Sequence, residues 1–248
     1  MEFQRNWIGL YKPKSIQIEQ KSKSDTYGKF VCQPLEKGYG LTIGNSLRRI
    51  LLSSIQGPAI TKIKIDGVQH EFSTITGIKE DVTEIILNLK QISLKMDTYE
   101  PQILNLSYAG EGEVTAKDIE TNQHVEIVNP DQFIATLSES AKLDMELTIE
   151  MGRGYVTTES RDDGSHSIGE IPIDAIFSPI KKVNYNVTAA RVGRRTDYEK
   201  LTIEVWTNGT IIPEDAVAYS AKIIKDQMTV FVNFDEEEID SIPIIEDE

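Results

Sequence analysis

Apolar residues recur at helical spacing between residues 35 and 57, LEKGYGLTIGNSLRRILLSSIQG. We expect one helix over about 42–55, because glycines precede it and Gly57-Pro58 ends it. At about 100° per residue, one stripe of this helix collects Ile43, Leu47, Ile50, Leu51 and Ser54. Such a stripe predicts burial against a core or against a partner.

The opposite face of the same helix carries Leu52 between Arg48 and Arg49. An exposed aliphatic side chain beside two guanidinium groups suits a surface that binds protein, since a guanidinium can pair with a carboxylate through two hydrogen bonds. The alternative is that both arginines are solvated and that Leu52 is an ordinary exposed leucine.

Alternation of apolar and polar residues predicts strands over most of the remaining chain. Residues 15–34 predict a hairpin, and Asp66-Gly67 predicts a second hairpin turn, because glycine supplies the positive φ that the turn needs. The clearest alternation runs through Leu143, Met145, Leu147, Ile149 and Met151. Polar turns separate these runs, so we expect a mostly antiparallel β region over about 57–175. Two further strands, around 183–187 and 201–205, predict another hairpin.

Two more helices are expected. Residues 81–89 place Val82, Ile85, Ile86 and Leu89 at helical spacing, with Lys90 closing the helix. The last helix begins at Pro213, and one stripe of it holds Val217, Ala221, Ile224, Met228 and Phe231, while a second holds Tyr219, Ile223 and Val230. Two apolar sides predict that this helix covers its own sheet and also meets a partner; a core helix of a larger monomer is the alternative.

Composition narrows the class of protein. The 248 residues carry a formal net charge of −14, which disfavours a surface that binds nucleic acid. Eight of these net negative charges lie in 235–248, which we expect to be an acidic linker or tail, so that −6 remains on the rest. The single cysteine, Cys32, excludes an internal disulfide. We find no membrane span and no signal peptide, and we expect a cytoplasmic protein without membrane partners.

The sequence contains no recognisable catalytic or cofactor motif. The glycines at 38, 40 and 44 do not have the G-x-G-x-x-G spacing, so we expect them to shape the turn into the helix rather than to bind a nucleotide. His70, His124 and His166 are far apart and do not form a metal motif. We therefore expect no cofactor, metal or catalytic residue; a nucleotide-binding hydrolase and a secreted β-rich binding module are the alternatives.

Several long blocks carry a family resemblance. GYGLTIGNSLRRILLSS resembles the first helix of the bacterial RNA polymerase alpha subunit, N-terminal domain. DGVQHEFSTITGIKEDVTEIILNLK, MGRGYV and IFSPIKKVNYNVTAARVGRRTDYEKLTIEVWTNGTIIPEDA continue the resemblance in the family's order. The resemblance implies an α+β fold of two subdomains. Residues 1–56 and 176–234 would form a discontinuous dimerisation subdomain with an antiparallel sheet and two long helices, and 57–175 an inserted, mostly β subdomain.

The function that the resemblance implies is a non-catalytic scaffold, a homodimer that assembles the beta and beta-prime subunits of RNA polymerase. It implies that Arg48, Arg49 and Leu52 bind beta and that Lys90, Ile173 and Arg191 bind beta-prime. Ile173 stands where the family often has valine. The dimer interface would contain Tyr39, Ile43, Leu47, Ile50, Ile224, Met228 and Phe231.

The family's full-length chain continues after an acidic linker into a small helical domain that contacts DNA and activators. We expect that domain to be absent here, and direct DNA binding to be absent with it. A contact between residues 160–166 and an activator is a further expectation, although the Asp162-Asp163 pair there is more typical of a solvated loop.

Overall fold

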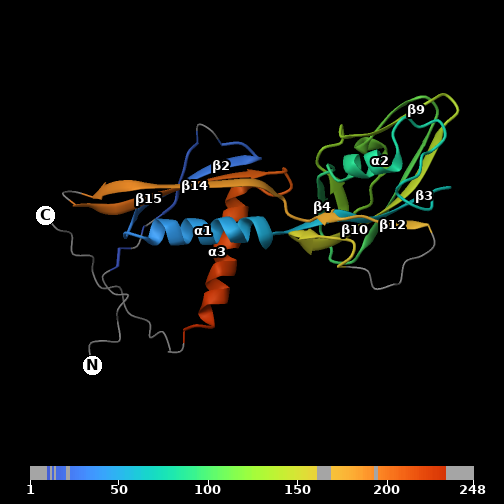
Figure 1. Cartoon of the computed structure of the whole chain (residues 1–248). Helices are drawn as coiled ribbons and strands as arrows, with labels where there is room; N and C mark the ends of the chain where they lie inside the picture. Colours follow the sequence, from blue (N-terminus) through green and yellow to red (C-terminus); the bar gives the residue numbers. More distant parts are fainter. Residues whose placement is uncertain are drawn as a thin grey trace.

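A computed structural model describes residues 10–11, 13, 15–20, 23–160, 169–192 and 195–232, without the side chains of 192, 195 and 196. The chain forms two lobes joined by a narrow waist (Figure 1). We call residues 10–55 and 177–232 the terminal lobe and residues 56–176 the inner lobe. The acidic tail expected over 235–248 and most of the loop expected over 160–166 lie outside the described residues.

The terminal lobe consists of a four-stranded antiparallel sheet, in the order β1-β2-β15-β14, and two helices. Its elements are β1 (Gln17–Ile18), β2 (Tyr27–Leu35), α1 (Tyr39–Ser53), β14 (Ile180–Val192), β15 (Arg195–Thr207) and α3 (Pro213–Thr229). Both predicted hairpins of this lobe are confirmed, since β1 pairs with β2 and β14 pairs with β15. Figure 1 shows α1 along one face of the sheet and α3 crossing α1.

The inner lobe is mostly β, as the alternation predicted. A five-stranded sheet has the order β12-β3-β10-β5-β7, and three two-stranded sheets pair β11 with β13, β4 with β8 and β6 with β9. Its elements are β3 (Gln56–Ile65), α2 (Val82–Leu89), β4 (Leu94–Met96), β5 (Gln102–Ala109), β6 (Gly112–Thr115), the short 3₁₀ helix η2 (Ala116–Asp118), β7 (Ile119–Glu120), β8 (Val125–Ile127), β9 (Phe133–Leu137), β10 (Lys142–Arg153), β11 (Tyr155–Val156), β12 (Glu170–Pro172) and β13 (Ala175–Ile176). With the terminal lobe, this gives the α+β fold expected from the sequence.

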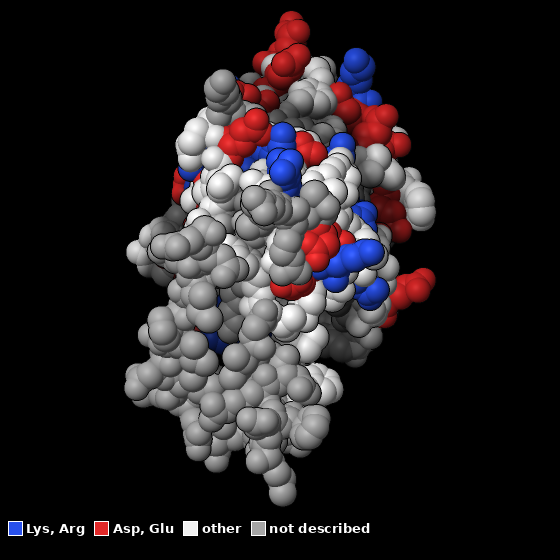
Figure 2. Space-filling view, turned by 90° about the vertical axis from the view of Figure 1, so that its left-hand side faces the viewer, with Lys and Arg blue, Asp and Glu red and all other residues white. Residues whose placement is uncertain are grey.

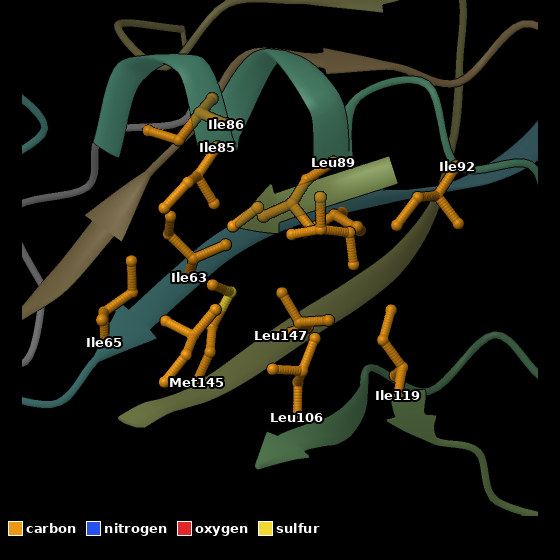
Figure 3. Packing of buried hydrophobic residues seen from close by; sticks show 14 of the residues in the cluster. Ile63, Ile65, Ile85, Ile86, Leu89, Ile92, Leu106, Ile119, Met145 and Leu147 are labelled. Carbon is orange, nitrogen blue, oxygen red and sulfur yellow. The ribbon is translucent and has the colours of Figure 1, made fainter. Parts of the chain in front are cut away.

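Each lobe has its own hydrophobic core. In the inner lobe, α2 lies over the five-stranded sheet and directs Ile85 and Leu89 toward Ile63 and Leu147 (Figure 3). The helix starts where expected, because the Asp81 carboxylate caps it by accepting a hydrogen bond from the Glu84 amide at 2.7 Å. In the terminal lobe, residues from β2, α1, β14, β15 and α3 form a second core. A third, small cluster at the waist joins Ala59, Ala175 and Phe177.

Of the three glycines that were expected to shape the turn into α1, only the first does so. Only Gly38 forms the turn: it is the residue before the helix and has a φ of 90°. Gly40 and Gly44 lie inside α1, which begins at Tyr39 rather than near Thr42. A methyl group on Gly44 would lie 2.7 Å from Tyr185 Cδ2, so the glycine allows the helix to approach the sheet closely. The turn prediction is therefore wrong for these two residues, because packing against the sheet requires their small size.

The hairpin predicted at Asp66-Gly67 is also wrong. Gly67 has the expected positive φ of 76°, and β3 ends just before this turn. Residues 68–81 form no strand that pairs with β3 and lead instead into α2. The partners of β3 are the distant strands β10 and β12, a non-local pairing that a turn motif does not report.

Candidate functional site

The outward side of α1 presents the first candidate surface. Arg49 is exposed, and its guanidinium forms no ion pair or hydrogen bond within the part of the chain that is described. Arg48 is also exposed, but its Nε donates to the carbonyl oxygen of Val183 on β14 at 3.3 Å. Arg49 is therefore the guanidinium that can pair with a partner's carboxylate without breaking an existing contact.

Leu52 differs from the expectation of a fully exposed side chain. It is half-buried and packs against the core of the terminal lobe. The reason is that α1 lies very close to the sheet. This close approach buries Leu51 completely and also covers part of Leu52 on the side of the helix. Part of the Leu52 side chain remains at the surface on the same helix as Arg48 and Arg49.

A second candidate surface lies on the inner lobe, next to the end of α2. Lys90 caps the C-terminus of α2, and its Nζ lies 3.8 Å from Oδ2 of Asp174. Ile173 precedes Asp174 and is 3% exposed within the inner core. The structure thus places Lys90 and Ile173 close together, but burial leaves Ile173 almost no side-chain surface to offer a partner.

Asp174 was not singled out from the sequence, yet it holds this surface together. Its Oδ1 accepts a hydrogen bond from the Thr158 amide at 2.9 Å, and its Oδ2 accepts one from the Tyr155 hydroxyl at 2.9 Å. These bonds, that from the Thr158 amide first, hold the pKa of Asp174 below its usual value. The same carboxylate raises the pKa of Tyr155. A lone aspartate in the run IPIDAI gives no sequence signal of these distant partners.

Arg191 is not part of that cluster. It is an exposed residue one position before the end of β14, whereas Lys90 lies on the other lobe. Figure 1 shows this end of the β14–β15 hairpin on the side of the molecule away from the inner lobe. A single partner that contacts both residues must therefore extend along β14 and across the waist.

The seven residues expected at a dimer interface fall into three groups. Tyr39, Met228 and Phe231 are exposed, with 46%, 57% and 81% of their surfaces accessible. Ile43, Ile50 and Ile224 are half-buried. Leu47, by contrast, is buried in the core of its own chain, because it lies on the side of α1 that faces the sheet.

The two halves of α3 have different environments. Its first half buries Ala216, Val217 and Ser220. Beyond Ile224 every residue to the end of the helix is exposed, and Figure 1 shows this half extending past α1, away from the sheet. Met228, next to the last residue of α3, and Phe231, two residues beyond its end, thus lie where the described chain does not cover them. The expected coverage of its own sheet is confirmed for the first half only, and Ala221, placed in the buried stripe by spacing, is exposed.

The start of α1 does not suit a phosphate group. The amide of Gly40, which a phosphate-binding helix would offer to its ligand, donates instead to Glu199 Oε2 at 2.9 Å. This carboxylate already occupies the helix end and would repel a second anion. The nucleotide-binding alternative therefore has no site at the Gly38–Gly44 turn.

Among the described residues, no group of three or more His, Cys, Asp or Glu side chains is arranged to hold a metal ion. Cys32 is half-buried in β2, and burial raises the pKa of its thiol. Within these ranges, no helix has both the length and the apolar character needed to cross a membrane. Figure 2, which views the end of the terminal lobe, shows Lys and Arg interspersed with Asp and Glu on the described part of that face.

Comparison with known proteins gives consistent matches over most of the chain. A family model described as the RNA polymerase Rpb3/RpoA insert domain matches residues 63–178. The chain is 57% identical over 233 residues to the DNA-directed RNA polymerase subunit alpha of Geobacter metallireducens, covering 94% of this chain and 68% of that protein. The corresponding subunit of Lawsonia intracellularis is 59% identical over 232 residues, covering 94% and 67%. That of Pelobacter propionicus is 53% identical over 233 residues, covering 94% and 68%.

Proposed function

The chain belongs to the family of bacterial DNA-directed RNA polymerase alpha subunits, and from this membership we propose that it is a homodimeric scaffold on which the beta and beta-prime subunits assemble. Family membership gives it a role in DNA-directed transcription as a subunit of a polymerase whose catalytic site lies in other subunits.

The observation that carries the proposal is the uncovered apolar end of α3. Met228 and Phe231 lie within one turn of each other, and neither is covered by the described chain. Fully burying a side chain of this size contributes about 1.5–3 kcal/mol, so a second copy that covers both gains a substantial part of a dimer interface. Tyr39, at the start of α1, adds further exposed surface.

In the proposed dimer, α1 and α3 of one protomer pack against the same helices of the other. The exposed residues Tyr39, Met228 and Phe231 would be its centre, and the half-buried Ile43, Ile50 and Ile224 would complete it. Leu47 would contribute indirectly. It is buried in the core of its own protomer and holds α1 in place there.

Binding of beta is assigned to the outward side of α1. Arg49 would be the energetic centre, because its guanidinium has no partner among the described residues and exposed aliphatic surface of Leu52 lies nearby. Arg48 would contribute less, since it already donates to Val183. Lys90 and Arg191 would contact beta-prime, with Ile173 supporting the surface from inside.

The test of the beta surface is a binding titration of the chain with the purified beta subunit of the same polymerase. Arg49→Ala should weaken binding by about 2 kcal/mol or more, roughly thirtyfold in Kd, as expected of a central arginine. Lys37→Ala, which removes another exposed cation shortly before α1, is the matched control and should leave Kd unchanged. Equal affinities for the parent chain and Arg49→Ala would remove Arg49 from the interface.

A further inference from the structure

The waist between the lobes is built around one buried aromatic ring. Phe177 is 4% exposed and packs with Ala59 and Ala175. Its backbone amide donates to the Gly154 carbonyl oxygen at 2.8 Å, which fixes the chain just after β13 to the end of β10. Phe177 thus lies between β13 of the inner lobe and β14 of the terminal lobe, where the chain passes back into the terminal lobe.

Two glycines make room for this residue. A methyl group on Gly152 would lie 2.6 Å from Cδ2 of the Phe177 ring, closer than real side-chain contacts allow. A methyl group on Gly57 would collide with the carbonyl oxygen of Phe177. Gly57 and Gly152 face each other across the β3–β10 ladder, and neither has a positive φ. Backbone conformation therefore does not require glycine at either position, whereas contact with Phe177 does.

Two other close approaches between the lobes do not involve this ring. A methyl group on Gly209 would come within 3.3 Å of Val128 on the inner lobe, and one on Gly154 would come within 3.3 Å of the Ser53 carbonyl oxygen on the terminal lobe. Phe177 differs from both because it is a large buried side chain, and close-packed side chains resist displacement, so its ring can fix the angle between the lobes.

We propose that Phe177 is a positioning residue, a wedge that sets the orientation of the inner lobe relative to the terminal lobe. Its role for assembly rests on the proposed function above. Lys90 lies on the inner lobe and Arg191 on the terminal lobe, so a beta-prime subunit that contacts both requires a fixed angle between them. The beta surface on α1 lies on the terminal lobe alone and is independent of that angle.

The orientation is measured as a distance distribution between two spin labels by pulsed electron paramagnetic resonance. The labels are placed at exposed positions, Glu113→Cys on β6 and Asn186→Cys on β14, in a Cys32→Ser background. Labelled chains are diluted into an excess of unlabelled chain, so that distances within one protomer dominate. The parent should give one narrow distribution. Phe177→Ala should broaden this distribution. If the alanine variant loses its native circular dichroism spectrum, Phe177→Leu is measured instead.

A double-mutant comparison separates a wedge from an ordinary core residue. Gly152→Ala should shift the mean distance in the parent, since the added methyl group displaces the ring, but should add no further change in the Phe177→Ala background. Leu143→Ala, which removes a fully buried side chain at the opposite end of β10 from Gly152, is the control and should leave the mean distance unchanged. An unchanged distribution in Phe177→Ala, or equal shifts from Gly152→Ala in both backgrounds, would overturn the proposal.

Assembly provides the second readout. Phe177→Ala should keep the parent's affinity for beta and lose affinity for beta-prime. Loss of both, or of neither, would overturn the link between lobe angle and assembly. A parent chain that binds neither large subunit would instead overturn the proposed function and leave the distance result standing.

Discussion

Asp174 is one side chain that organises a surface, although no sequence motif predicts this role. Its carboxylate accepts hydrogen bonds from Thr158 and Tyr155 and lies beside Lys90, so it joins the segment around β11 to the end of α2, which is far away in the sequence. Lys90 was expected at the beta-prime surface through family resemblance, but the group that orients it became visible only in the fold. The resemblance supplies positions that are expected to contact a partner, whereas the supporting residues depend on distances that spacing along the chain does not encode.

The bonds to Asp174 predict a pH dependence of stability. Because the pKa of Asp174 is lowered in the folded chain, its contribution is fully present above the unfolded aspartate pKa of about 3.9 and is lost as pH falls through the folded pKa. Asp174→Asn should therefore be less stable than the parent to urea at neutral pH, with the difference shrinking below pH 4. Asp131→Asn, at an exposed position, is the control. A difference that stays constant down to the acid transition would show that the charge contributes nothing.

At the scale of elements, the two outer helices differ in how well the pattern predicted them. The apolar stripe of α1 correctly identified Leu51 as buried, and the mixed face correctly placed Arg48 and Arg49 outside. The pattern could not show that Leu52 is half-buried, because that depends on how closely α1 approaches the sheet through Gly40 and Gly44. Two apolar stripes on α3 were visible in the sequence, but the boundary between its covered and uncovered halves was not.

The orientation of α1 predicts a large difference between two leucine substitutions. Leu51→Ala removes a fully buried side chain and should lower the free energy of unfolding by about 2–5 kcal/mol. Leu87→Ala makes the same chemical change on α2, where the side chain is 55% exposed, and should change stability by about 0.5 kcal/mol or less. Chemical denaturation of both variants checks this, and similar losses would mean that the assigned inward face of α1 is incorrect.

The whole molecule joins two cores through a waist, and its chain enters and leaves the inner lobe at that point. Local alternation predicted β5, β10 and the β14–β15 hairpin correctly, since each buries every second residue on one face. The turn motif Asp66-Gly67 gave a wrong hairpin, because β3 pairs with strands far along the chain. Phe177 carries no sequence signal for the same reason, because its role depends on Gly57 and Gly152 from two other segments.

The proposed scaffold function requires that the uncovered end of α3 be an interface between two copies of the chain. Light scattering coupled to size-exclusion chromatography measures this as the mass in solution. The parent should have the mass of two chains, and the double variant Met228→Glu with Phe231→Glu should have the mass of one, because two buried carboxylates would be too costly to desolvate. The control Lys222→Glu with Thr229→Glu adds as many carboxylates on another side of α3 and should remain dimeric. A monomeric parent, or a double variant that stays dimeric, would contradict the proposed scaffold.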